Sequence, residues 1–129
     1  MQNLKDISKI ILSRSGIRNP FNKMFKELEF ETTSYCNRKC DYCPNVEFER
    51  FGEDENFLMK QEVFETLIDQ LVDLKFTGLI SPHLYGEPLS DHRMLSWAEH
   101  IKKKLPECRL KIVTNGDFLN KNNFKNFID

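Results

Sequence analysis

The chain has 129 residues, of which 40% are hydrophobic and 30% are charged, and its formal net charge is −1. These values are typical of one soluble globular domain and argue against disorder throughout the chain. The balanced charge, without a basic patch, argues against binding to nucleic acid or anionic lipid. No apolar run approaches the roughly 20 residues of a membrane span, and the N-terminus lacks the apolar region of a secretory signal. A cytoplasmic location is therefore expected.

The first 20 residues are expected to form an N-terminal helix and a linker, ahead of a domain over residues 21–129. Leu4, Ile7, Ile10 and Ile11 recur at helical spacing, which predicts a short amphipathic helix over residues 3–15.

Strands and helices alternate along the rest of the chain. The hydrophobic pattern predicts strands over residues 27–33, 79–85 and 109–114, and helices over residues 59–74, 90–104 and 121–129. Strands separated by helices imply crossover connections and a parallel sheet. The predicted fold class is therefore α/β, with a parallel sheet built from about three βα units.

The two faces of this predicted sheet differ in polarity. The face expected to pack against the helices carries Leu28, Phe30, Ile80, Leu84, Leu110 and Ile112. The other face carries Glu29, Glu31, Ser81, His83, Tyr85, Lys111, Val113 and Asn115. A parallel sheet covered by helices on both sides would be apolar on both faces. A polar second face instead fits a curved sheet whose concave side holds a charged ligand, with His83, Glu29, Glu31 and Lys111 as candidates for substrate contact. The alternative for these four residues is a structural ion pair or hydrogen bond, such as one between a glutamate and Lys111.

The predicted helices also have a buried side. In the first of them, Val63, Leu67, Ile68, Leu71 and Val72 are expected to face the sheet. In the second, the inward residues are Met94, Ala98 and Ile101, while Lys102–Lys104 complement the dipole at the helix end. His92 and His100 are expected on its surface.

Three cysteines gather in one short segment directly after the first predicted strand. Cys36, Cys40 and Cys43 are separated by four and three residues, so one loop can wrap them around a compact metal centre. A structural zinc site uses four protein ligands, and a cubane iron–sulfur cluster usually has four thiolates. Three thiolates on a cubane would leave one iron open to a small molecule.

The cysteine spacing is also compatible with zinc binding, a redox pair or a chance cluster. Zinc binding would need a fourth ligand such as Cys108, which is expected to lie at the opposite end of the sheet as a structural or free thiol. A thioredoxin-like role for the Cys40–Cys43 pair would leave Cys36 unexplained.

Three motifs together resemble the radical S-adenosylmethionine (SAM) superfamily. They are the cysteine loop with Tyr42 before its last cysteine, the segment Tyr85-Gly86-Glu87-Pro88 after the second predicted strand, and Val113-Thr114-Asn115-Gly116 at the end of the third. Tyr85 stands where the family pattern often has a first glycine. The short sequence segments around the cysteines are most similar to those of the SPASM-type branch, whose members modify peptides.

The resemblance implies a fold, two cofactors and a set of site residues. The fold would be a partial (β/α)6 barrel, and Cys36, Cys40 and Cys43 would ligate a [4Fe-4S] cluster whose open iron binds SAM. Tyr42 would lie against the adenine, Gly86 and Glu87 would approach the methionine amino group, and Asn115 would line the cofactor pocket. Reductive cleavage of SAM would give a 5′-deoxyadenosyl radical that abstracts hydrogen from a substrate.

The resemblance also implies partners. An electron donor such as flavodoxin or ferredoxin would reduce the cluster, and the substrate would be a peptide or a small molecule. For Phe48, Phe51 and Phe57, two roles are open: covering the cluster or packing against the sheet. Six barrel units need roughly 190 residues, so the chain would supply the N-terminal half, as a fragment or paired with a second chain. The alternative function is a non-catalytic module that binds zinc or a protein partner.

Overall fold

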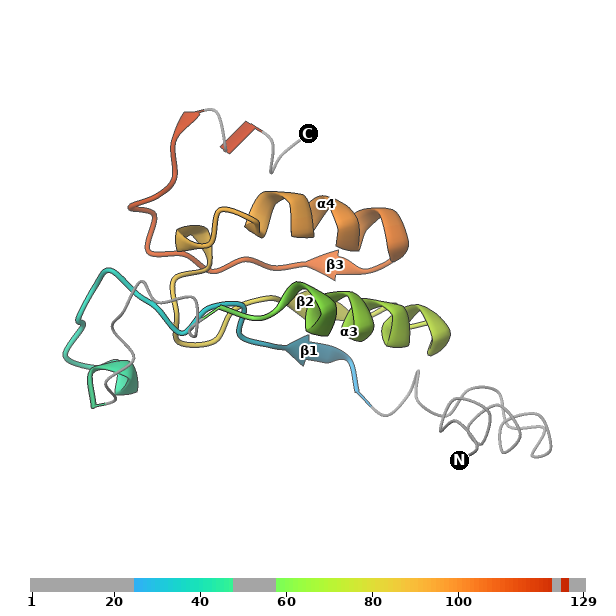
Figure 1. Ribbon diagram of the computed structural model, residues 1–129, viewed down its shortest axis with the longest axis horizontal. Coiled ribbons are helices and arrows are strands. Elements are labelled where there is room, and N and C mark those ends of the chain that lie inside the picture. The colour runs from blue at the N-terminus through green and yellow to red at the C-terminus, as the bar shows by residue number, and fades with distance from the viewer. Residues whose placement is uncertain (1–24, 48–57, 122–123, 126–129) are drawn as a thin grey trace.

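The computed structural model describes residues 25–47, 58–121 and 124–125. Its centre is a three-stranded parallel sheet in the order β1-β2-β3, formed by Glu27–Glu29, Leu79–Ser81 and Arg109–Leu110. Helix α3 (Gln61–Asp73) precedes β2, and helix α4 (Met94–Lys104) precedes β3, so each crossover contains a helix (Figure 1). Short 3-10 helices follow the first two strands, η1 over Pro44–Glu47 and η3 over Pro88–Ser90. The predicted α/β class and its parallel sheet are confirmed.

The strands are shorter than the sequence pattern predicts. Leu28 pairs with Ile80, and Ile80 pairs with Leu110. The ladder extends one step further, because the Phe30 amide donates to the Ser81 carbonyl at 3.1 Å and the Lys111 amide donates to the Ile80 carbonyl at 2.9 Å. Pro82 follows β2 directly and has no N–H to continue a central ladder. Beyond this point, the alternation between faces no longer holds.

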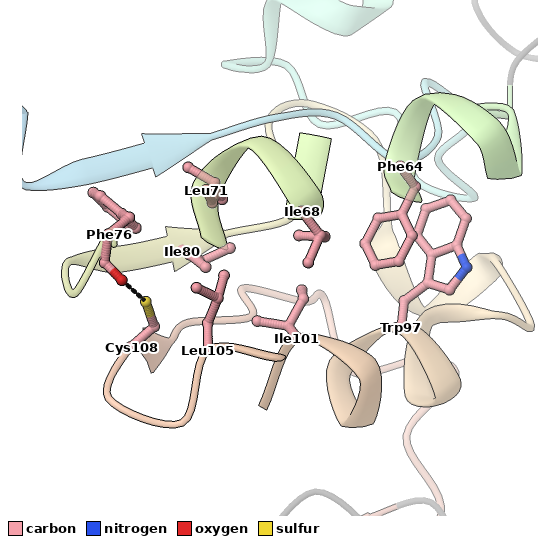
Figure 2. Close-up of a cluster of buried hydrophobic side chains, with 9 residues drawn as sticks. All are labelled: Phe64, Ile68, Leu71, Phe76, Ile80, Trp97, Ile101, Leu105 and Cys108. Atoms are coloured by element: carbon pink, nitrogen blue, oxygen red, sulfur yellow. Dashed lines mark hydrogen bonds between the residues drawn. The ribbon is translucent and has the colours of Figure 1, made fainter. Parts of the chain in front are cut away.

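The hydrophobic core lies between the sheet and the two helices (Figure 2). Phe64 of α3 stacks on Trp97 of α4, with ring centroids 4.0 Å apart and an interplanar angle of 6°. The buried cluster consists of Phe64, Ile68, Leu71, Phe76, Ile80, Trp97, Ile101, Leu105 and Cys108. Leu28, Phe30 and Leu110 pack against it, which confirms the predicted apolar face of the sheet. The prediction for Leu84 is wrong: its exposed fraction is 49%, because β2 has already ended.

The buried stripe of α3 is displaced from the predicted one. Phe64, Ile68 and Leu71 are buried, whereas Val63 and Val72 are exposed. Residues 64, 68 and 71 follow the i, i+4, i+7 spacing of one helix face, and the two valines lie at its margins.

The inward residues predicted for α4 are confirmed, whereas the helix begins at Met94, four residues later than the pattern predicts. Met94, Ala98 and Ile101 are buried, and Trp97 joins them. Lys102–Lys104 form the last turn, where cations complement the helix dipole. His92 is exposed as predicted, whereas His100 is partly buried and its ring centroid lies 5.7 Å from that of Phe64.

Cys108 is a structural cysteine, as the sequence predicts. It is 2% exposed, and its thiol donates to the Phe76 carbonyl oxygen at 3.1 Å (Figure 2). Burial raises the pKa of this thiol, which keeps it protonated. Because Cys108 precedes β3, it lies at the amino edge of the parallel sheet, whereas the cysteine loop follows β1 at the carboxyl edge.

Several sequence predictions lie outside the described residues. These are the helix over residues 3–15, the three phenylalanines Phe48, Phe51 and Phe57, and most of the last helix, of which residues 121, 124 and 125 have helical backbone. Within the described ranges, no helix has the length and apolar character required to cross a membrane.

Replacing Ile68 by alanine is expected to lower the free energy of unfolding by about 2–5 kcal/mol, because it leaves a cavity beneath the sheet. Urea denaturation followed by circular dichroism measures this change. Val63→Ala on the same helix is the matched control and should change stability by less than about 0.5 kcal/mol. Equal losses in the two variants would contradict the observed orientation of α3.

Candidate functional site

The loops that follow the three strands lie together at the carboxyl edge of the sheet. In an α/β fold with parallel strands, this edge is where ligands bind. Figure 1 shows the loops after β1, β2 and β3 on the same side of the sheet. The three predicted motifs therefore meet at one edge, as the strand order requires.

The cysteine loop holds three reduced thiols. Cys36, Cys40 and Cys43 form no disulfide, and each is partly exposed. The Cys43 amide donates to the Cys40 carbonyl at 2.9 Å, which closes a tight turn between these two residues. Tyr42, inside this turn, is 90% exposed. Its side chain is therefore available to a ligand at the loop surface.

The thiols are not gathered around a single point. Within the described ranges, no three His, Cys, Asp or Glu side chains are close enough to hold one metal ion. In a cubane, each thiolate binds a different iron, so the ligands of a [4Fe-4S] cluster stay apart from one another. A set of three partly exposed thiols on one short loop fits such a cluster.

The loop after β3 is bound to the cysteine loop. The Asn115 side-chain amide donates to Asn37 Oδ1 at 2.8 Å and lies 3.9 Å from Cys36 Sγ. Asp117 accepts hydrogen bonds from Asn37 Nδ2 and Arg38 Nε, each at 2.8 Å, and forms an ion pair with Arg38. The Arg38 hydrogen bond lowers the pKa of the Asp117 carboxyl. These contacts hold the segment between the first two cysteines.

Glu87 joins the loop after β2 to the loop after β3. Its carboxylate is buried, with 2% of the residue exposed. Oε1 accepts from Thr114 Oγ1 at 2.6 Å and from the Leu89 amide at 2.9 Å, and Oε2 accepts from the Asn115 amide at 2.7 Å. The structure thus gives this side chain a supporting role that the sequence did not indicate. The approach of Glu87 to the methionine amino group stays a prediction.

Gly86 is required by its close contact with the loop after β1. A Cβ atom at this position would lie 1.8 Å from the Thr33 carbonyl oxygen, so no larger residue fits. The neighbouring Glu87 amide donates to the Tyr35 carbonyl at 2.7 Å. Glu31 supports the same turn, because its Oε1 accepts from the amides of Tyr85 and Gly86, each at 3.0 Å. Substrate contacts of Glu31 stay a prediction.

The polar face of the sheet carries an ion pair and a partly buried histidine. Lys111 Nζ lies 3.5 Å from Glu27 Oε1, the kind of pairing with a glutamate that the sequence pattern suggests. Ser81 donates to the same Glu27 carboxylate at 3.2 Å. The Nδ1 atom of His83 is buried and has no hydrogen-bond partner among the described residues. Glu29 is exposed on this face.

The network around Asp117 was not predicted from the sequence. Arg38 and Asp117 lie nine and seven residues beyond the ends of β1 and β3, two strands that are not adjacent, and their opposite charges are the only sequence signal of a contact. The sequence pattern indicates Thr114 only as part of a motif, because its hydroxyl contact with Glu87 depends on the tertiary arrangement.

Comparisons with known proteins agree with this geometry. Residues 30–129 match the family model described as the Radical SAM superfamily. An S-adenosyl-L-methionine-dependent 2-deoxy-scyllo-inosamine dehydrogenase of Niallia circulans is 41% identical over 98 residues, which are 76% of this chain and 38% of that protein.

Two solved structures share the fold. The crystal structure of BtrN in complex with AdoMet and 2-DOIA has 36% sequence identity and a TM-score of 0.72, and the match covers 81% of this chain and 42% of that one. The structure of selenomethionine BtrN in an open conformation has 35% identity and the same TM-score, and the match covers 81% and 45% of the two chains.

The chain belongs to the radical SAM superfamily, a family of enzymes that use SAM and a [4Fe-4S] cluster. This confirms the resemblance, the fold class and the two cofactors expected from it. The chain spans about two fifths of the length of the relatives it matches. The SPASM-type branch and the individual site residues stay predictions.

Replacing Glu87 by alanine is expected to destabilise the chain by about 1–3 kcal/mol, because the hydroxyl of Thr114 and two backbone amides lose their buried acceptor. Chemical denaturation measures the loss. Glu99→Ala, which removes an exposed carboxylate from α4, is the control and should have little effect. A Glu87→Ala variant as stable as the wild type would contradict the supporting role.

The pKa of His83 is expected to lie below its ordinary value of 6.5, first because burial disfavours the charged ring and second because Lys111 repels it. Glu29, Glu27 and Glu87 act in the opposite direction. The neutral ring therefore favours folding above the ordinary pKa, and this contribution is lost as the pH falls through the folded-state pKa. An NMR titration of the His83 ring measures the shift, and Lys111→Met should raise this pKa. A His83 pKa above 6.5 in the wild type would contradict the prediction.

Proposed function

We propose that this chain carries the N-terminal half of the core of a radical SAM enzyme, with Cys36, Cys40 and Cys43 as the ligands of its [4Fe-4S] cluster. The observation that carries the proposal is the set of three reduced, partly exposed thiols on one loop at the ligand-binding edge of the sheet. Three thiolates would leave one iron for the amino and carboxylate groups of SAM. The reduced cluster would supply the electron for reductive cleavage of SAM to methionine and a 5′-deoxyadenosyl radical, and this radical would abstract hydrogen from the substrate.

The protein residues position the two cofactors. Tyr42 lies at the surface of the cysteine loop, where it can contact the adenine. The backbone of Gly86 and Glu87 lies near the methionine amino group. The buried Glu87 carboxylate holds this backbone in place through its own hydrogen bonds. Asn115 lines the same pocket from the loop after β3. No side chain of this half is assigned to hydrogen abstraction itself, because the radical belongs to the cofactor.

The proposed substrate is a small polar molecule. The relative from Niallia circulans is named as a dehydrogenase of 2-deoxy-scyllo-inosamine, and it is 41% identical to this chain over the matched region. The polar face of the sheet, with Glu29, His83 and Lys111, suits hydroxyl and amino groups better than an apolar ligand. The segments around the cysteines, which resemble the SPASM-type branch, suggest a peptide substrate instead. This substrate class has no comparable support.

Further partners complete the proposal. A small electron-transfer protein such as flavodoxin or ferredoxin would reduce the cluster in the cytoplasm. The remaining barrel units would come from further sequence or from a second chain, since the match covers 42% of the structural relative. The zinc alternative required Cys108 as a ligand, and the buried position of this thiol at the other edge of the sheet gives that alternative no support.

Anaerobic reconstitution with iron and sulfide tests the proposal. The wild-type chain is expected to acquire about four irons and four sulfides, the content of one cubane. SAM should perturb the EPR signal of the reduced cluster, because it occupies the open iron. Alanine at Cys36, Cys40 or Cys43 should abolish cluster formation.

The matched control is Cys108→Ala, which should retain the full iron and sulfide content because this thiol points into the core. If the wild type binds no iron and sulfide, or if it binds zinc that is lost on removal of Cys108, the proposed function is wrong.

A further inference from the structure

The orientation of the Asn115 side chain is fixed by its neighbours. Its Oδ1 accepts from the Asp117 amide at 3.0 Å, so its Nδ2 must point the other way, toward the cysteine loop. There, Nδ2 donates to Asn37 Oδ1 at 2.8 Å and lies 3.9 Å from Cys36 Sγ. An amide nitrogen carries two hydrogens, one for each of these acceptors. The sulfur of Cys36 therefore receives an N–H group whose direction is set by the surrounding network.

The backbone of Asn115 is held as firmly as its side chain. Its amide donates to Glu87 Oε2 at 2.7 Å, and this carboxylate is buried. On the other side, Asp117 binds Asn37 and Arg38, the two residues that follow Cys36. Donor and acceptor are thus anchored to each other through contacts on both sides, so the N–H···S contact does not depend on one weak hydrogen bond.

We propose that Asn115 is a positioning residue that donates a hydrogen bond to the Cys36 thiolate and raises the reduction potential of the [4Fe-4S] cluster. The inference rests on the proposed function, since it takes Cys36 as a cluster ligand. One-electron reduction adds negative charge to the cluster and its sulfurs, and an N–H donor stabilises the more negative state. Hydrogen bonds to the sulfurs are among the factors that set cluster potentials, and groups beyond the ligands commonly tune a metal centre.

This role differs from that of a residue that only lines the SAM pocket. A pocket residue affects SAM binding and leaves the potential of the SAM-free cluster unchanged. A donor to Cys36 affects that potential in the absence of SAM. The two roles can therefore be separated by one measurement made before SAM is added.

Potentiometric EPR titration of the reconstituted, SAM-free chain tests the inference. In Asn115→Ser, the ratio of reduced to oxidised cluster at a fixed potential should fall by about two- to tenfold, the range that one hydrogen bond contributes. Asn115→Asp keeps the acceptor for the Asp117 amide, removes the donor and adds a negative charge, so its ratio should fall further. Asn120→Ser removes an exposed amide from the same segment and should leave the ratio unchanged.

Each outcome decides one question. If both Asn115 variants acquire the cluster with the wild-type ratio and only SAM binding changes, the inference is overturned while the proposed function stands. If the wild-type chain acquires no cluster at all, the proposed function fails and the inference fails with it. If Asn115→Ser folds like the wild type by circular dichroism but loses the cluster that Asn120→Ser retains, the contact with Cys36 is supported.

Discussion

A buried carboxylate that has no cationic partner among the described residues holds this site together. Glu87 is 2% exposed, and burial of an ionised group costs several kcal/mol unless hydrogen bonds replace its water. Three donors do so here: the amide of Leu89 in η3, the hydroxyl of Thr114 and the amide of Asn115. Two of them come from the loop after β3. The charge is therefore compensated only when the loops after β2 and β3 adopt their observed positions together.

Contacts between neighbouring loops continue around the carboxyl edge of the sheet. The loop after β1 contacts the loop after β2 where Gly86 touches Thr33, at a distance that excludes any side chain. The loop after β2 contacts the loop after β3 through Glu87, and the loop after β3 returns to the first through Asn115 and Asp117. The loops after the three strands, the cysteine loop among them, thus form a closed ring of contacts.

The sequence predicted those features that depend on strand order and local pattern. Leu28, Ile80 and Leu110 face the core because strand alternation is a local property, and the position of Cys108 before β3 places it at the amino edge, away from the cysteine loop. The predicted burial of Leu84 is wrong because Pro82 ends the ladder before this residue. The predicted burial of Val63 is wrong because Phe64, a larger side chain one position further on, points into the core instead.

The candidate site likewise has features that the sequence predicts and features that it does not. Spacing alone identified Cys36, Cys40 and Cys43, whereas the contacts among the loops depend on how side chains from three strands meet. Neither the acceptor role of Glu87 nor the ion pair of Arg38 with Asp117 has a period or spacing that a sequence pattern could reveal. These contacts depend on the tertiary arrangement of the three strands.

The arrangement separates two tasks within the fold. The residues proposed to bind the cofactors lie on the three loops, which hold one another in place, and the polar face carries Glu29, His83 and Lys111 on the strands and just beyond them. In the relatives, the matched region is about two fifths of the chain, so a substrate on this face would meet additional protein on its other sides. Similarity in the cofactor half therefore argues most strongly for shared radical chemistry. Under the proposed function, selection among polar substrates would depend on how the polar face and the remaining barrel units combine.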